Sequence, residues 1–177
     1  NVPAKLKISQ EPEEQAGSQL MARWDGDAAA PVLAHEGEAL LMKRAQGSAT
    51  LIQMVNSGQD DEAIRILCAV VARLHTPRPK PIPELIPLVQ WFESLLSTAA
   101  THCGILEHCA GAARELLAAP RDVAVLHGDI HHGNVLDFGQ AGWLAIDPKG
   151  LYGERGFDYA NILCNPDEAS ALAPERF

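Results

Sequence analysis

Apolar residues at two different spacings divide the start of the chain into a strand and a helix. Residues 1–8 have the short pattern typical of a strand. Ala16, Leu20 and Trp24 then form one apolar stripe at helical spacing, and the helix is expected to begin near Pro12 because proline is tolerated in a first turn. A strand followed by an amphipathic helix is therefore predicted.

A β-hairpin is expected next in the chain. Two short apolar runs, 31–33 and 39–42, flank the polar turn 35–38, which is the pattern of two strands joined by a tight connection. Gly47 follows as a hinge-like residue.

The middle of the chain is predicted to be helical. Asp60 and Asp61 can cap a helix that ends at His75, with apolar residues three and four positions apart: Ile64, Leu67, Cys68, Val71 and Leu74. A proline-rich connector, 76–87, separates it from two further helices, expected at 88–101 and 105–119.

Strands and tight loops return after residue 120. A strand at 123–126 precedes the polar loop 127–134, and a hairpin through DFGQAG leads to a second apolar strand that ends on Asp147. A last helix is expected at 157–164. The fold class is thus α+β: a small β-rich part, then a helical part that carries a hairpin with polar residues at its mouth.

Composition and charge narrow the function classes. The 177 residues are 47% hydrophobic and 21% charged, and no apolar run approaches the length of a membrane span. With 23 acidic against 14 basic residues, the net charge of -9 argues against a nucleic-acid partner and favours cationic small molecules. The sequence carries no signal for an oligomeric state.

The four cysteines indicate the redox environment. Cys68, Cys103, Cys109 and Cys164 show no C-x-x-C spacing, which favours reduced thiols in a cytoplasmic protein.

Three polar residues near strand ends form the most informative pattern. Asp129 and Asn134 lie five positions apart across a loop, and Asp147 follows thirteen positions later, after the expected hairpin. Protein kinases use this arrangement: the first Asp accepts the proton of the substrate hydroxyl, and the Asn and second Asp hold magnesium.

A literal kinase string, Asp137-Phe138-Gly139, also occurs, but it follows Asn134 by only three residues. That distance leaves no room for a hairpin, so the string is interpreted as the turn itself, where Asp and Gly are favoured. Asp147 is then the metal-binding candidate.

The chain resembles the aminoglycoside phosphotransferase family in two stretches, VLHGDIHHGNVL and WLAIDPKGLYGERGFDYANIL. The branch it resembles most contains streptomycin 6-phosphotransferases, the aminoglycoside and hydroxyurea antibiotic-resistance kinases. The resemblance implies a protein-kinase-like two-lobed fold and transfer of the ATP γ-phosphate to a hydroxyl of a small molecule, such as the aminoglycoside streptomycin.

The resemblance also implies roles for individual residues. Asp129 would orient and deprotonate the acceptor hydroxyl, and Asn134 and Asp147 would bind Mg²⁺. Lys7 would hold the α- and β-phosphates with Glu14 as its ion-pair partner, although Lys5 and Glu13 are rivals for these two roles; Met42, Lys43 and Ala45 would form the adenine hinge.

The same resemblance suggests a division into a nucleotide-binding lobe, 1–46, and a helical lobe with the catalytic and metal-binding loops, 47–177. No glycine-rich phosphate loop precedes Lys7, so an incomplete N-terminal lobe is expected. Further C-terminal helices are expected beyond Phe177.

Glu154, Arg155 and Asp158 are more consistent with bracing the loop beneath the site, although Glu154 and Asp158 are also candidates for contacting a cationic substrate.

Three alternatives stay open at this point. One is a kinase of another small alcohol or of hydroxyurea, and another is a pseudokinase that binds nucleotide without catalysis. The third is a zinc hydrolase that uses His127, Asp129, His131 and His132. His75, at a helix end, is expected to pack or cap.

Overall fold

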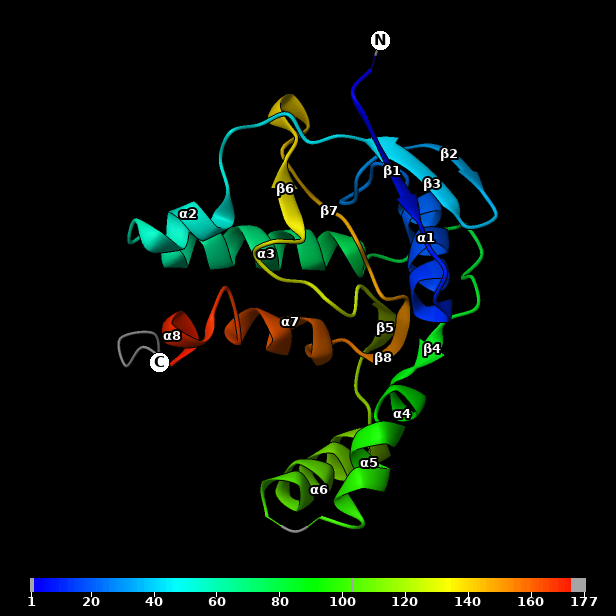
Figure 1. Ribbon diagram of the computed structural model, residues 1–177, viewed down its shortest axis with the longest axis vertical. Helices are drawn as coiled ribbons and strands as arrows, with labels where there is room; N and C mark the ends of the chain where they lie inside the picture. Colours follow the sequence, from blue (N-terminus) through cyan, green and yellow to red (C-terminus); the bar gives the residue numbers. More distant parts are fainter. Residues whose placement is uncertain (1, 103, 173–177) are drawn as a thin grey trace.

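The computed structural model describes residues 2–102 and 104–172 (Figure 1). Cys103 lies outside this range, and Cys68, Cys109 and Cys164 are free thiols. The strands are β1 (Ala4–Ile8), β2 (Val32–Glu36), β3 (Ala39–Lys43), β4 (Ile86–Pro87), β5 (Val123–Leu126), β6 (Val135–Asp137), β7 (Trp143–Ala145) and β8 (Leu151–Glu154). The helices are α1 (Pro12–Trp24), α2 (Leu51–Asn56), α3 (Asp60–Leu74), α4 (Leu88–Trp91), α5 (Glu93–Ala99), α6 (Ile105–Ala118), α7 (Gly156–Leu163) and α8 (Glu168–Ala171), with a 3-10 turn η1 (Gly139–Ala141).

The N-terminal sheet confirms the predicted strand, helix and hairpin. Its three strands are antiparallel in the order β1-β3-β2, and the central strand β3 buries Leu40 and Met42 while its other side chains are more exposed. Helix α1 buries Ala16, Leu20 and Trp24, because their spacing places all three on one helical face.

The predicted central helix is also confirmed, with one change at its start. Helix α3 buries Leu67, Val71 and Leu74, but its N-cap is Gln59, so Asp60 and Asp61 lie within the first turn instead of capping it. There their charges face the positive end of the helix dipole. Helix α2 was not predicted, although its N-cap Thr50 accepts a hydrogen bond from the Gln53 N–H at 3.1 Å.

The prediction of one continuous helix at 88–101 is wrong. The segment is divided into α4 and α5 at Phe92. The Phe92 ring packs edge to face on Phe157, with the ring centroids 5.9 Å apart, and Leu88 is buried against Leu126 and Leu151. These contacts fix α4 against the body, whereas α5 turns away with α6 to one end of the molecule (Figure 1).

Two sheets of the second half surround the polar loop. Strand β8, which the sequence did not predict, pairs antiparallel with β5 and parallel with β4. The predicted hairpin is present as β6 and β7. The loop 127–134 therefore leaves the sheet after β5 and enters the hairpin at β6.

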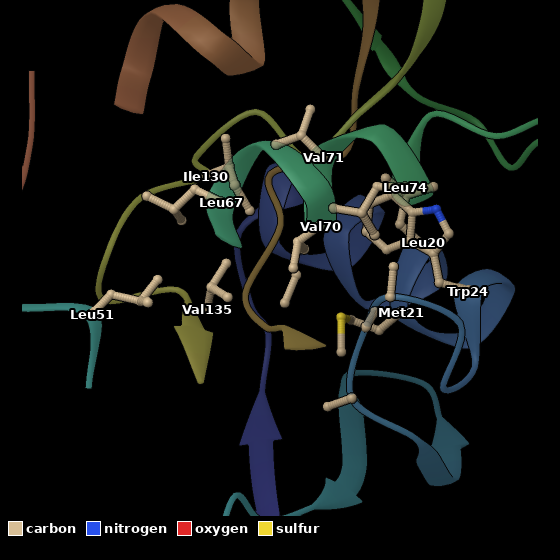
Figure 2. Close-up of a cluster of buried hydrophobic side chains, with 14 of the residues drawn as sticks. Leu20, Met21, Trp24, Leu51, Leu67, Val70, Val71, Leu74, Ile130 and Val135 are labelled. Atoms are coloured by element: carbon tan, nitrogen blue, oxygen red, sulfur yellow. The ribbon is translucent and has the colours of Figure 1, made fainter. Parts of the chain in front are cut away.

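One hydrophobic core joins the N-terminal elements to this loop. Helix α1 contributes Leu20 and Met21 and helix α3 contributes Leu67 and Val71; Ile130 comes from the loop, and all five are buried (Figure 2). The polar loop is therefore anchored by an apolar side chain at its centre.

The backbone of helix α1 also lies against the backbone of the segment after β7. A Cβ added to Gly17 would overlap the carbonyl oxygen of Pro148. Only a residue without a side chain permits this contact, which sets α1 directly against the segment that carries Asp147.

Gly17→Ala is expected to destabilise the protein by about 1–3 kcal/mol, the usual cost of overpacking. This corresponds to a melting temperature lowered by roughly 2–12 °C. Gly111→Ala is the matched control, because Gly111 also lies inside a helix but has no atom within 4 Å of the added Cβ. The control is expected to be stabilising by about 0.5–1 kcal/mol. Equal melting temperatures for the two variants in a thermal scan would contradict the close contact.

Among the described residues, no helix is long and apolar enough to cross a membrane.

Candidate active site

The hairpin brings the two predicted metal ligands together at its mouth. Val135 of β6 pairs with Ala145 of β7, and the Ile146 N–H donates to the Asn134 carbonyl oxygen at 2.9 Å. Asn134 therefore forms the last hydrogen bond of the hairpin with Ile146, and Asp147 is the next residue along the chain. Asp147 has a left-handed backbone, φ 62°, which turns the chain out of the strand at this residue.

The literal Asp137-Phe138-Gly139 string lies at the opposite end of the hairpin. Asp137 pairs with Trp143 at the turn, and its Oδ1 accepts the Gly139 N–H at 2.8 Å. The interpretation of this string as a turn is confirmed.

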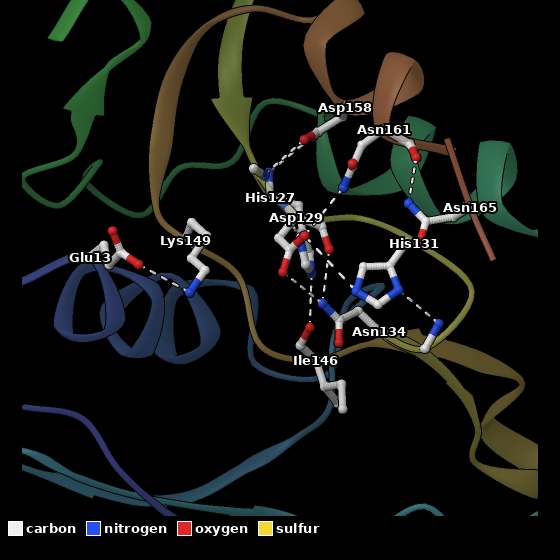
Figure 3. A network of polar contacts seen from close by, with 12 residues as sticks. Glu13, His127, Asp129, His131, Asn134, Ile146, Lys149, Asp158, Asn161 and Asn165 are labelled. Carbon is white, nitrogen blue, oxygen red and sulfur yellow. Dashed lines mark hydrogen bonds and ion pairs between the residues drawn. The ribbon is translucent and has the colours of Figure 1, made fainter. Parts of the chain in front are cut away.

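The Asp129 carboxylate is held from two sides (Figure 3). Asn134 Nδ2 donates to the Asp129 carbonyl oxygen at 2.9 Å and lies 3.3 Å from Oδ2. Asn161 Nδ2, from helix α7, lies 3.3 Å from Oδ1. Asn161 was not predicted from the sequence, where its position one helical turn after Asp158 was the available signal. A carboxylate bonded on both oxygens has a fixed orientation.

His127 forms the buried base of the loop. The Asp129 N–H donates to its Nδ1 at 3.2 Å, and its Nε2 lies 2.9 Å from the Ile146 carbonyl oxygen. Since a carbonyl oxygen only accepts, Nε2 carries the proton. Nδ1 accepts a hydrogen bond and therefore carries none, so the ring is neutral. Burial lowers the pKa of His127 despite the nearby Asp158 charge. The ring also stacks on Trp24 of α1, with centroids 6.3 Å apart.

Asp158 holds the backbone of the same loop. Its Oδ2 accepts the His127 N–H at 2.9 Å and its Oδ1 accepts the Gly128 N–H at 2.8 Å. His75, at the end of α3, donates from Nε2 to Oδ2 at 2.8 Å. Gly128 has φ 82°, a conformation that favours glycine. Asp158 is completely buried, so it braces the loop and does not face a substrate.

Glu154 is likewise a bracing residue. It pairs with Val123 at the end of the β5–β8 ladder that is remote from the loop, since the loop follows Leu126 at the other end. Its carboxylate accepts the Arg121 N–H. These contacts therefore favour the interpretation that Glu154 and Asp158 brace the loop and its sheet over the interpretation that they contact a substrate.

Lys7 joins the N-terminal sheet to the hairpin mouth. Its ammonium forms ion pairs with Glu14 of α1 and with Asp147. The rival Lys5 is exposed on β1, whereas the Lys7 and Glu14 side chains are only about one-fifth exposed, at 20% and 21%. The structure brings together Lys7 and Glu14, as the resemblance implied.

The rival Glu13 has a different partner, which the sequence analysis missed. Lys149 Nζ lies 3.1 Å from Glu13 Oε1 and 2.6 Å from Glu14 Oε1. Burial alone would lower the pKa of Lys149, but hydrogen bonds to Glu14 and Glu13 outweigh it and raise that pKa. Burial alone would raise the pKa of Glu14, and hydrogen bonds from Lys149 and Lys7 lower it.

The hinge candidates lie at the end of the central strand β3 and just after it. Met42 is buried, and the Lys43 N–H already donates to the Pro31 carbonyl oxygen at 2.9 Å. Lys43 can therefore offer only its carbonyl group to a ligand. Ala45 lies beyond the strand, and within residues 2–102 and 104–172 no hydrogen bond engages its N–H.

The donor set at the hairpin mouth fits Mg²⁺. Asn134 turns its amide nitrogen to Asp129, which leaves the amide oxygen for a cation, and the Asp147 side chain is 46% exposed. Mg²⁺ is usually bound by one or two carboxylates together with substrate phosphates and waters.

Zinc hydrolysis does not fit the histidines. Both ring nitrogens of His127 form hydrogen bonds with the backbone, and His131 Nδ1 accepts the Gly133 N–H at 3.0 Å. Among the described residues, no group of three or more His, Cys, Asp or Glu side chains could hold a metal ion.

Comparison with known proteins identifies the family. The profile described as "Aminoglycoside/hydroxyurea antibiotic resistance kinase" matches residues 1–177. The chain belongs to this kinase family. Its similar members include a streptomycin 3''-kinase of Klebsiella pneumoniae, 58% identical over 94% of this chain and 62% of that protein. A streptomycin 6-kinase of Streptomyces griseus is 35% identical over 88% of this chain and 52% of that protein, so the chain spans about half to three-fifths of these relatives' lengths.

Solved structures confirm the expected kinase-like α+β fold. A choline/ethanolamine kinase family protein from Mesorhizobium loti superposes with a TM-score of 0.66 at 18% identity, over 97% of this chain and 60% of that one. An aminoglycoside-3'-phosphotransferase of type VIII gives a TM-score of 0.57 at 19% identity, over 97% of this chain and 72% of that one.

Proposed function

We propose that this kinase transfers the γ-phosphoryl group of ATP to a hydroxyl of an aminoglycoside, with streptomycin as the first candidate. The observation that carries the proposal is the Asp129 carboxylate held by Asn134 and Asn161, with Asn134 in turn bonded to Ile146, the residue before Asp147. Such a carboxylate can accept the hydroxyl proton while the attacking oxygen approaches the phosphorus in line.

The remaining side chains would bind the nucleotide. Lys7 would bind the phosphates, supported by Glu14, and the Lys43 carbonyl and Ala45 N–H would bind adenine. Asn134 and Asp147 would hold Mg²⁺, which neutralises charge on the phosphate oxygens when it is bound. Catalysis would then rest mainly on positioning and charge neutralisation, in the cytoplasm where ATP is available.

Two findings support a cationic acceptor of the streptomycin type. The net charge of -9 favours approach of a polycation, and the 58% identical relative is named a streptomycin 3''-kinase. We therefore place the 3'' hydroxyl ahead of the 6 hydroxyl, which the sequence-based resemblance had favoured. A hydroxyurea phosphotransferase of Kitasatospora aureofaciens, 34% identical over 92% of this chain, makes hydroxyurea the second candidate acceptor.

ADP release with ATP and Mg²⁺ tests the proposal when streptomycin, other aminoglycosides and hydroxyurea are each added. We expect release to depend on streptomycin. If only hydroxyurea stimulates ADP release, hydroxyurea replaces streptomycin as the proposed acceptor. If the protein binds nucleotide but no acceptor stimulates ADP release, a pseudokinase is favoured.

A further inference from the structure

A second lysine holds the glutamate that positions Lys7. The two oxygens of Glu14 have different partners: Lys7 contacts Oε2, and Lys149 lies 2.6 Å from Oε1. Lys149 Nζ also lies 3.1 Å from Glu13 Oε1, and Figure 3 marks this ion pair with a dashed line. The resulting chain of alternating charges runs from Glu13 through Lys149, Glu14 and Lys7 to Asp147.

Two backbone contacts hold the segment that carries Lys149. The Lys149 N–H donates to the His127 carbonyl oxygen at 2.8 Å, beside the catalytic loop. The preceding residue, Pro148, lies in backbone contact with Gly17 of α1. The Lys149 side chain is 23% exposed, so its charge interacts with the glutamates through a partly desolvated region, where ion pairs are screened less than at the surface.

Lys7, in contrast, shares its ammonium between two carboxylates, Glu14 and Asp147. A cation bound at the hairpin mouth would compete for the Asp147 oxygens, and Lys7 would then depend on Glu14 alone. A glutamate side chain has several rotatable bonds and loses orientation unless a second group holds it. The contact of Lys149 with Oε1 supplies that second group.

We propose that Lys149 is a positioning residue for nucleotide binding. It fixes the Glu14 carboxylate by one oxygen, so that the other oxygen aims the Lys7 ammonium at the phosphates. This inference rests on the proposed ATP-dependent function and assigns a role to a residue outside the kinase lysine–glutamate pair.

The test compares Lys149→Met, Lys149→Arg and Lys80→Met in the full chain. Methionine keeps an apolar stem without the charge, and arginine restores the charge. Lys80→Met removes the same charge from a side chain that is 54% exposed and lies outside the chain of alternating charges. Binding of the ATP analogue AMP-PNP with Mg²⁺ is measured by calorimetry, together with the KM for ATP and for the acceptor.

We expect Lys149→Met to weaken AMP-PNP binding and raise the KM for ATP by roughly 10- to 100-fold, by analogy with the loss caused when a side chain that orients a metal ligand is removed. The acceptor KM should stay unchanged, and Lys149→Arg should recover most of the loss. Unchanged AMP-PNP affinity, an equal loss in Lys80→Met, or failure of arginine to restore binding would overturn the proposal.

The outcomes separate this inference from the proposed function. If the unaltered protein binds AMP-PNP but transfers phosphate to no acceptor, the proposed function fails and the affinity comparison still decides the role of Lys149. If the unaltered protein binds no AMP-PNP, both proposals are overturned.

Discussion

Asp129→Asn is expected to lower kcat for acceptor phosphorylation by roughly 100- to 10,000-fold, the usual contribution of a positioned general base. Asparagine keeps the size of the side chain and can accept the hydrogen bonds from Asn134 or Asn161, but it cannot take the hydroxyl proton. AMP-PNP affinity should therefore change little, and the two measurements together separate chemistry from binding.

The control for this variant is Asp137→Asn, in the literal kinase string. Asp137 lies at the hairpin turn, where asparagine can accept the Gly139 N–H equally well. Asp137 lies at the opposite end of the hairpin from Asn134 and Asp147, so kcat should remain within about threefold of the unaltered protein, the scale of a substitution that removes no major interaction. A large loss of kcat in Asp137→Asn, together with a normal kcat in Asp129→Asn, would show that Asp129 is not the general base and would contradict the proposed site.

Asp158→Ala is expected to destabilise the protein by about 3–5 kcal/mol, the cost of breaking a buried charged network. Alanine leaves the His127 and Gly128 N–H groups and His75 Nε2 without their buried acceptor. Thermal unfolding should shift downward by roughly 6–20 °C.

Asp61→Ala is the matched control, because Asp61 is an exposed residue in the first turn of α3. Its removal should change stability by less than about 1 kcal/mol, the range for a charge near a helix dipole. Equal stability of the two variants would show that Asp158 does not support the loop.

A helix or strand was predictable from the sequence where its own residues repeat at the period of that structure. Helix α1 and helix α3 each bury one face, and that face repeats at the helical period in the sequence. Strands β4 and β8 were missed because β4 has only two residues and both depend on partners far along the chain. The division between residues 46 and 47 stays a prediction.

The site was predictable only where the family pattern fixes residue spacing. Asn134 and Asp147 lie at the hairpin mouth as expected, and Lys7 contacts Glu14. Lys149 was missed because it has no local signal that distinguishes it from an ordinary surface residue, and the one signal for Asn161, its position one helical turn after Asp158, does not reveal a contact with Asp129. Both residues reach the site only through tertiary contacts: α7 places Asn161 next to Asp129, and the segment after β7 places Lys149 next to Glu14 of α1.

Structural analysis of the streptomycin recovered after incubation with ATP and Mg²⁺ tests the central claim most directly. Phosphorus NMR should show one phosphate monoester on a streptomycin hydroxyl, with the 3'' position expected, and the Asp129→Asn protein should leave the antibiotic unmodified. Recovery of unmodified streptomycin from the unaltered protein, or of streptomycin carrying a nucleotide instead of a phosphate, would contradict the account.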